Sequence, residues 1–337
     1  MCHVEPTAGS NVAMRRLLSS AALALSFLAG HSADAASNDA LSGDFFPYRY
    51  FQTLPSTRID VGGGALEVAI APGNLELPKA TILNWVGRSA RAVANYFGRL
   101  PDAQAKLLIV PVEGSGVRGG TTYGTRGAAS RIVFGRDTTE DQLARDWILV
   151  HELVHHGFPS VGAQHHWLEE GLATYVEPIA RAQAGELSAQ VVWRDLVRGL
   201  PKGLPQPGDE GLDHTPTWGR TYWGGALFYL LADIEIRRRT GNRRGLQHAL
   251  RAIVSAGGNI GRDWPVEKVL ATGDAGTETR VLQDLYRQMK AAPVDVDLAD
   301  LWRQLGVSMN GGSVSFDEWH PLPKFVAQSP RPAAARW

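Results

Sequence analysis

The chain has 337 residues, of which 44% are hydrophobic and 20% charged, and its 34 Lys and Arg residues balance its 34 Asp and Glu residues. This composition is that of a soluble globular protein and excludes a disordered or fibrous one. The balanced charge argues against nucleic acid as a partner, because phosphate recognition needs clustered cations. The densest basic cluster, in residues 237–244, is short and typical of a solvated helix end. The single cysteine, Cys2, excludes an intramolecular disulfide.

The N-terminal segment is typical of a secretory signal peptide. A short basic start at residues 14–16 precedes an apolar run at 17–29, and small residues follow at Ala33 and Ala35 in the A-x-A pattern. We therefore predict that residues 1–36 are a signal peptide region, with cleavage near Ala35 and export to the periplasm or beyond. The alternative is an uncleaved membrane anchor, but the run is short for a hydrocarbon core of about 30 Å. No other run is long enough to cross a bilayer, so the mature protein is expected to have no membrane span.

Apolar patterns predict a small sheet and one long helix in the first part of the mature chain. Residues 65–72, 107–112 and 131–135 are predicted as strands. A helix is predicted over residues 78–100, because its apolar residues recur at helical spacing. Residues 37–60 are rich in aromatic residues and are predicted to be irregular.

The remainder is predicted to be mainly helical. Thr138 or Thr139 is expected to cap a helix that continues through the sequence HELVHHG, with Gly157 as its C-terminal cap. A loop rich in Gly and Pro is predicted at residues 199–219. Further helices are predicted at 167–183, 187–198, 221–240, 242–256, 276–291 and 297–305.

The sequence HELVH at residues 151–155 carries the strongest chemical signal. His151 and His155 are four residues apart, so on a helix their imidazoles lie one turn apart and can converge on one metal ion. Glu152 lies beside them, where a carboxylate can reach a water molecule and act as a general base. Catalytic zinc sites have three protein ligands, so a third ligand is required. The segment WLEEGLATYVE offers Glu169 and Glu170 for this position.

Together, HELVHHGFP and WLEEGLATY resemble the paired signature of the gluzincin metallopeptidases, which include thermolysin, aminopeptidase N and the glycyl aminopeptidases. In the aminopeptidase branch the second motif is W-L-N-E-G-F-A, and its Glu before Gly is the third zinc ligand. The resemblance therefore implies Glu170 as the third ligand, while Glu169, which replaces the family's Asn, remains the alternative. The interval from His155 to Glu170 is four residues shorter than in the aminopeptidases, which implies a shorter loop between the two helices.

Two other segments correspond to sequence segments of the aminopeptidases. RTYWGGALF, from residue 220, resembles their Y-x-K-G-A segment, which implies that Tyr222 donates a hydrogen bond to the oxyanion of the substrate; an aromatic core residue at a helix start is the alternative. GGTTYG at 119–124 corresponds to their G-A-M-E-N segment but has no carboxylate to hold a substrate amino terminus. We expect it to be an edge strand that pairs with the substrate backbone.

Three further histidines, His156, His165 and His166, lie close to the two motifs in the sequence. We expect them to be surface residues beside the metal helix, since His156 is rotated by about 100° from its neighbour around the helix axis.

The predicted fold is α+β and similar to the thermolysin catalytic core. A lobe with a small mixed sheet, residues 37–158, ends in the zinc helix; a mainly helical lobe, residues 159–310, supplies the third zinc ligand; residues 311–337 form a C-terminal extension. The favoured function is an exported zinc metallopeptidase that binds Zn²⁺ and hydrolyses a peptide or protein substrate. The alternatives are a zinc hydrolase of another amide, such as a cell-wall amide, and a non-catalytic zinc-binding relative. The sequence leaves open the side-chain preference, endopeptidase or aminopeptidase cleavage, and the oligomeric state.

Overall fold

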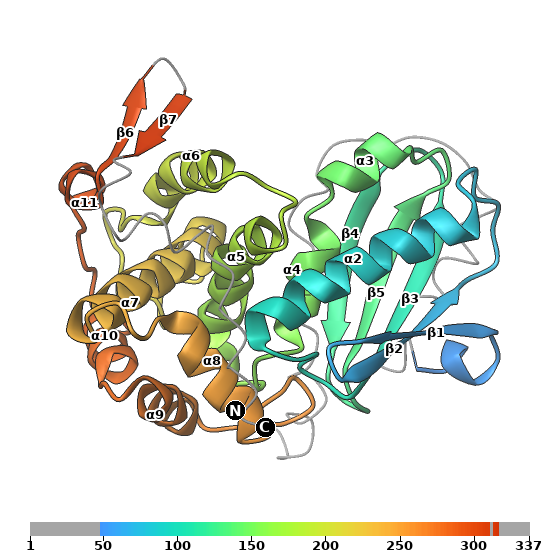
Figure 1. Cartoon of the computed structure of the whole chain (residues 1–337). Helices are drawn as coiled ribbons and strands as arrows, with labels where there is room; N and C mark the ends of the chain where they lie inside the picture. Colours follow the sequence, from blue (N-terminus) through green and yellow to red (C-terminus); the bar gives the residue numbers. More distant parts are fainter. Residues whose placement is uncertain (1–47, 311–312, 317–337) are drawn as a thin grey trace, which may run out of the picture.

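A five-stranded mixed sheet forms one side of the molecule (Figure 1). The structure is a computed structural model that describes residues 48–310 and 313–316. The strand order is β1-β2-β3-β5-β4; β2, β3 and β5 are parallel, whereas β1 and β4 pair antiparallel at the two edges. The strands are β1 (Ser56–Val61), β2 (Gly64–Ile70), β3 (Gln104–Val112), β4 (Val117–Tyr123) and β5 (Ala129–Gly135). The α+β class and the small mixed sheet are confirmed, and the Gly-rich segment is the edge strand β4.

Strand β1 shows that the prediction of an irregular segment over residues 37–60 is wrong at its end. The hairpin turn between β1 and β2 is Gly62–Gly63, and both glycines have positive φ values, 55° and 76°. A two-residue hairpin turn of this kind needs positive φ at both positions, which glycine adopts without a steric penalty. A short 3-10 helix, η2 (Tyr50–Gln52), precedes β1.

Alternate residues of the central strands face opposite sides of the sheet, as the period of two in a strand requires. Helix α2 (Lys79–Phe97) packs against one face and belongs to the main hydrophobic core. The other face carries a smaller cluster that includes Leu108 and Val110, with Tyr50 and Phe51 packed against it. The sheet is therefore covered on both faces.

The segment that leads into the HELVH motif forms two helices where one was predicted. These are α3 (Glu140–Arg145) and α4 (Ile148–His155), and Asp146 between them has an extended backbone, with φ −63° and ψ 136°. The carboxylate of Asp146 accepts the backbone N–H groups of Ile148 and Leu149, at 3.1 and 3.2 Å. An Asp in this position satisfies the free N–H groups of a new helix, so it ends one helix and starts the next.

The cap predicted at the start of this segment is confirmed, whereas the cap predicted at its end is wrong. Thr139 caps α3, as expected, and forms a capping box with Gln142. Gly157 is not a left-handed C-cap, because its φ is not positive. Its lack of a side chain serves packing instead, since a Cβ there would lie 2.4 Å from the ring of Phe97.

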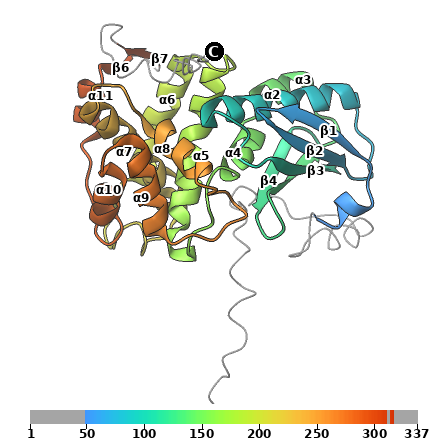
Figure 2. The same cartoon turned by 60° about the horizontal axis from the view of Figure 1, so that its bottom comes forward.

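Helices dominate the rest of the chain (Figures 1 and 2). Helix α5 (His166–Gln183), which carries the second motif, lies between α4 and α7 and contacts both. The other helices are α6 (Ala189–Gly199), α7 (Gly225–Arg239), α8 (Leu246–Ser255), α9 (Val266–Thr277), α10 (Val281–Met289) and α11 (Leu298–Gln304). Shorter turns are η3 (Ala163–His165), η4 (Leu200–Gly203) and the π-helix η5 (Gly219–Gly224), and a hairpin of β6 (Val307–Asn310) and β7 (Ser313–Phe316) follows α11.

The helix predicted over residues 276–291 is confirmed in α10 but was placed to begin too early, and α9 before it was not predicted. Helix α9 ends where Glu278 adopts a left-handed conformation with φ 57°. The carboxylate of Asp274 then accepts the backbone N–H groups of Leu282 and Gln283, at 2.9 and 3.1 Å, in the first turn of α10. As at Asp146, a side-chain carboxylate satisfies the free N–H groups at the start of a helix.

One continuous buried apolar cluster joins the sheet and α2 to the helices that follow and extends to the β6–β7 hairpin. The helices contribute residues such as Trp85 of α2, Tyr175 of α5 and Phe228 of α7. This shared core fixes α4 and α5 relative to each other, which matters because each carries part of the site. None of the described helices combines the length and the apolar character that crossing a membrane requires.

Candidate metal centre and active site

Helix α4 places both histidines of the HELVH motif on one side of a buried helix. The ring centroids of His151 and His155 are 5.0 Å apart. Their side chains are 5% and 8% exposed, so both imidazoles are largely removed from water. This is the arrangement that the four-residue spacing predicts for an α-helix.

Glu170 of α5 meets these two imidazoles. Its Oε2 atom lies 3.2 Å from Nε2 of His151 and 3.7 Å from Nε2 of His155. One potential ligand atom from each of the three residues lies within 4.8 Å of the others. Two imidazole nitrogens and one carboxylate oxygen form a donor set typical of catalytic zinc sites, which leave a fourth position for water or substrate. The three side chains therefore fit a zinc ion.

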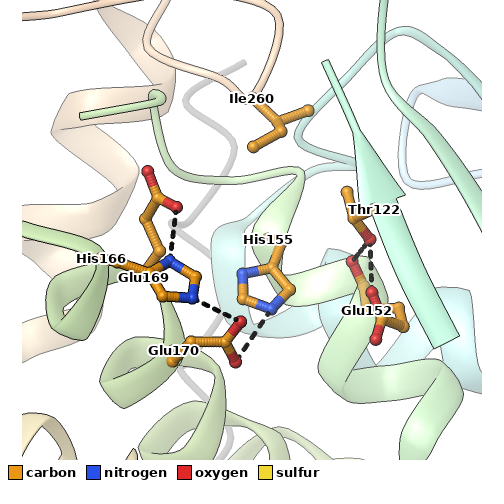
Figure 3. A pocket seen from close by; sticks show the side chains of 7 residues that line it. All are labelled: Thr122, Glu152, His155, His166, Glu169, Glu170 and Ile260. Carbon is orange, nitrogen blue, oxygen red and sulfur yellow. Dashed lines mark hydrogen bonds and ion pairs between the residues drawn. The ribbon is translucent and has the colours of Figure 1, made fainter. Parts of the chain in front are cut away.

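Glu169 faces a different environment, although it is adjacent to Glu170 in the sequence. Its Oε1 accepts the backbone N–H of Val161 at 2.9 Å, and its Oε2 lies 3.3 Å from Nδ1 of His166 (Figure 3). Both oxygens of Glu169 are thus engaged away from His151 and His155. Of the two candidate carboxylates, the structure brings Glu170 into the histidine cluster.

The shifted pKa values of these three groups favour the binding of a cation between them. Burial lowers the pKa of His155 to about 3, so this imidazole is neutral at pH 7. Burial alone would also lower the pKa of His151, but the contact with Glu170 raises it overall. Burial alone would raise the pKa of Glu170, but the adjacent imidazoles lower it to about 2. An ionised carboxylate beside a neutral imidazole offers ligand atoms that a proton or a metal ion can occupy.

Glu152, the predicted general base, is held by the edge strand β4. It is 1% exposed. Its Oε2 accepts a hydrogen bond from Oγ1 of Thr122 at 2.7 Å (Figure 3). Gly120 lies two residues earlier on the same face of β4, and a Cβ there would be 2.4 Å from Cγ of Glu152. The small residues of the GGTTYG segment thus make room for the carboxylate and bind it, a role that the sequence did not indicate.

Tyr222 lies beside the histidines on the π-helix η5. Its ring stacks on His151, with centroids 6.4 Å apart and an interplanar angle of 18°. The residue is half-buried and is not part of the buried core, which disfavours the alternative of a core aromatic residue. Close contact between α5 and α7 brings it there: a Cβ on Gly171 would lie 2.4 Å from backbone atoms of Gly225. Only glycine at this crossing lets α5 and α7 pack closely enough for Glu170 and Tyr222 both to lie beside the histidines.

The prediction that the neighbouring histidines are surface residues is wrong for His156 and His165. His156 is fully buried and its Nε2 lies 2.8 Å from Oγ of Ser130. His165 is 8% exposed, and its Nδ1 lies 2.8 Å from the carboxylate of Asp213 in the loop before η5. Helix phase alone does not place a residue at the surface when a strand or loop covers that side of the helix. His166 lines the pocket, with its Nε2 3.4 Å from Oε1 of Glu170.

A pocket of about 270 Å³, partly open to solvent, gives access to these groups (Figure 3). Its lining comes from β4, α4, α5 and the loop between α8 and α9, which contributes Ile260. Ile260 donates its backbone N–H to the carbonyl of His156, at 3.3 Å. The site therefore lies where the sheet meets the helices. The lining residues are Thr122, Glu152, His155, His166, Glu169, Glu170 and Ile260.

The fold is similar to that of known metallopeptidases. An aminopeptidase N family protein from Idiomarina loihiensis superimposes with a TM-score of 0.57 at 13% identity, over 76% of this chain and 49% of that protein. The chain has the fold of an aminopeptidase N family protein. The predicted resemblance to gluzincin metallopeptidases is thus confirmed at the level of the fold.

A second similar structure is the M1 zinc metallopeptidase from Deinococcus radiodurans. Its TM-score is 0.47 at 18% identity, over 72% of this chain and 53% of that protein. The chain spans about half the length of the solved structures that it matches. No family model matches the sequence. No curated protein sequence is similar to it.

Proposed function

We propose that this protein is a zinc-dependent metallopeptidase that hydrolyses peptide bonds with a metal-activated water. The observation that carries the proposal is the buried convergence of His151, His155 and Glu170, with Glu152 adjacent. A cluster retained only to hold metal needs its ligands but has no use for a general base. The fold shared with an aminopeptidase N family protein supports the same activity.

Each residue has a distinct role in this proposal. His151, His155 and Glu170 would hold a zinc ion, which when bound would supply a Lewis acid and lower the pKa of a water molecule. Glu152 accepts the proton of that water and returns it to the leaving amine. Tyr222 donates a hydrogen bond to the carbonyl oxygen of the substrate, where negative charge develops during attack.

The substrate class that we propose is a peptide or protein that reaches the cluster through the pocket beside β4. A cleavage assay with a diverse library of quenched fluorescent peptides tests this directly. The wild-type protein should cleave members of the library, and Glu152→Gln should retain zinc while losing turnover, because it preserves shape and removes the base. Glu210→Gln, the same substitution at an exposed position, is the control and should behave as wild type. If the protein binds zinc but cleaves only cell-wall amides, the proposed substrate would be a cell-wall amide instead of a peptide.

We also propose that the protein is exported, on the basis of the signal-like segment over residues 1–36. This segment lies outside the described residues. Mass spectrometry of the N-terminus from fractionated cells should find a mature chain that begins near residue 36. Recovery of the uncleaved chain from the cytoplasm would contradict export.

A further inference from the structure

We propose that Thr122, Ser130 and His156 are positioning residues that form a one-directional chain of hydrogen-bond donors ending on the carboxylate of Glu152. The chain begins at a fully buried histidine and passes through two hydroxyl groups. It rests on the proposed function only where it treats Glu152 as the general base.

Three short contacts build the chain. Nε2 of His156 lies 2.8 Å from Oγ of Ser130, and Oγ of Ser130 lies 3.0 Å from Oγ1 of Thr122. Oγ1 of Thr122 lies 2.7 Å from Oε2 of Glu152 and 2.9 Å from its backbone oxygen. Ser130 and His156 are completely buried and Glu152 is 1% exposed, so water does not compete for these three groups. Thr122 between them is half-buried and lines the pocket.

The chemistry of the groups fixes the direction of the chain. An ionised carboxylate and a backbone carbonyl only accept hydrogen bonds, so the single proton of Thr122 is donated to Glu152. Ser130 must then donate its proton to Thr122, because the Thr122 hydroxyl has none left to share. The hydroxyl oxygen of Ser130 consequently accepts from His156, and Nε2 of His156 carries a proton.

An independent feature of His156 supports this direction. Its Nδ1 atom is buried and has no hydrogen-bond partner among the described residues. In the tautomer with the proton on Nε2, this Nδ1 is an unprotonated lone pair. The opposite tautomer would leave a buried N–H without an acceptor and would face Ser130 with an atom that cannot donate.

This chain of hydrogen bonds constrains the Glu152 side chain from the side of β4. Gly120 and Thr122 lie two residues apart on β4 and face α4 together, since side chains alternate along a strand. Gly120 leaves space for the Glu152 side chain, and Thr122 binds one of its oxygens. We infer that Ser130 and His156 act through Thr122, by keeping its proton directed at Glu152.

Kinetics on one of the cleaved fluorescent peptides test the inference. Thr122→Val keeps the shape but removes the donor, so kcat should fall on the order of tenfold, with KM and zinc content unchanged. Thr122→Ser, which keeps the hydroxyl, should restore most of the lost kcat. Thr277→Val is the control, because Thr277 is fully buried and its hydroxyl donates to a backbone oxygen within α9, outside the pocket that the half-buried Thr122 lines. Equal losses in Thr122→Val and Thr277→Val, or a normal kcat in Thr122→Val, would overturn the proposal.

A double-mutant cycle separates a connected chain from independent structural effects. Ser130→Ala should lower kcat, and Thr122→Val combined with Ser130→Ala should lower it no further than Thr122→Val alone. His156→Gln should keep more activity than His156→Leu, because the glutamine amide can still donate to Ser130. Losses that multiply in the double variant would show that Ser130 does not act through Thr122.

A measurement without turnover keeps this inference separable from the proposed function. The ¹⁵N chemical shifts of histidine-labelled protein, with the His156 signal assigned through His156→Gln, report which ring nitrogen is protonated. Protonated Nε2 and unprotonated Nδ1 are expected even if no peptide is cleaved. A proton on Nδ1 would overturn the donor chain, whereas an inactive protein with the expected tautomer would count only against the peptidase proposal.

Discussion

Gly120 offers the sharpest test of how the site is held together. In Gly120→Ala, the new Cβ would lie 2.4 Å from Cγ of Glu152 and 2.7 Å from Cδ and Oε1 of the same residue. Ordinary contacts of a Cβ begin near 3.4 Å, so the Glu152 side chain must retreat by about 1 Å. A displacement of about 1 Å in a catalytic group costs on the order of a hundredfold in turnover. Overpacking of this size lowers the free energy of unfolding by about 1–3 kcal/mol, which leaves the protein folded if its stability is typical.

The neighbouring glycine provides a matched control for this substitution. A Cβ on Gly119 would have no atom within 4 Å. We expect kcat for a cleaved fluorescent peptide to fall about a hundredfold in Gly120→Ala and to remain near wild type in Gly119→Ala, with zinc bound in both. Urea unfolding monitors the fold of each variant. Full turnover in a folded, zinc-loaded Gly120→Ala would refute the placement of Glu152 against β4 or its role as the base.

Three further predictions concern the surroundings of the site. Tyr222→Phe should lower kcat about a hundredfold while zinc content and KM stay unchanged; normal kcat would exclude an oxyanion donor. Gly171→Ala should lower the free energy of unfolding in urea by about 3 kcal/mol, because its Cβ would meet backbone atoms of Gly225 at 2.4 Å; a loss below about 0.5 kcal/mol would show that the helices can separate freely. Burial raises the pKa of Asp146 to about 6, so its protonated form is favoured on folding. The stability that protonated Asp146 contributes is therefore complete below about pH 4 and is lost as the pH rises through 6. The difference in unfolding free energy between wild type and Asp146→Asn should change by about 2–3 kcal/mol over this range. A difference that stays constant with pH would contradict the raised pKa.

The helical spacing of His151 and His155 could be predicted because four residues always bring two side chains to one face of a helix. The meeting with Glu170 could not follow from spacing alone, since it depends on how α4 and α5 cross. The resemblance of WLEEGLATY to a family motif indicated Glu170, and the structure shows why Glu169 differs: its oxygens bind Val161 and His166.

The supporting residues were harder to find because their roles arise between distant segments. His156 was predicted to lie at the surface from helix phase, yet Ser130 of β5 approaches that side of α4 and covers it. Thr122 gave no chemical signal in the sequence, because a hydroxyl on an edge strand usually faces solvent. The helix boundary at Asp146 was missed because apolar periodicity continues across its carboxylate cap. The start of α10 was placed too early because its cap, Asp274, comes from the preceding helix, α9, which was not predicted.

Zinc content measured by elemental analysis tests the central claim most directly. The purified wild-type protein should contain one zinc per chain, and His151→Ala combined with His155→Ala should contain none. Glu169 and Glu170 form a matched pair for the third ligand, since the two residues differ only by one position in α5. Glu170→Gln should lose most of the bound zinc on dialysis, whereas Glu169→Gln should keep it. Zinc retained in the histidine double variant, or lost in Glu169→Gln but not in Glu170→Gln, would contradict the proposed ligand set.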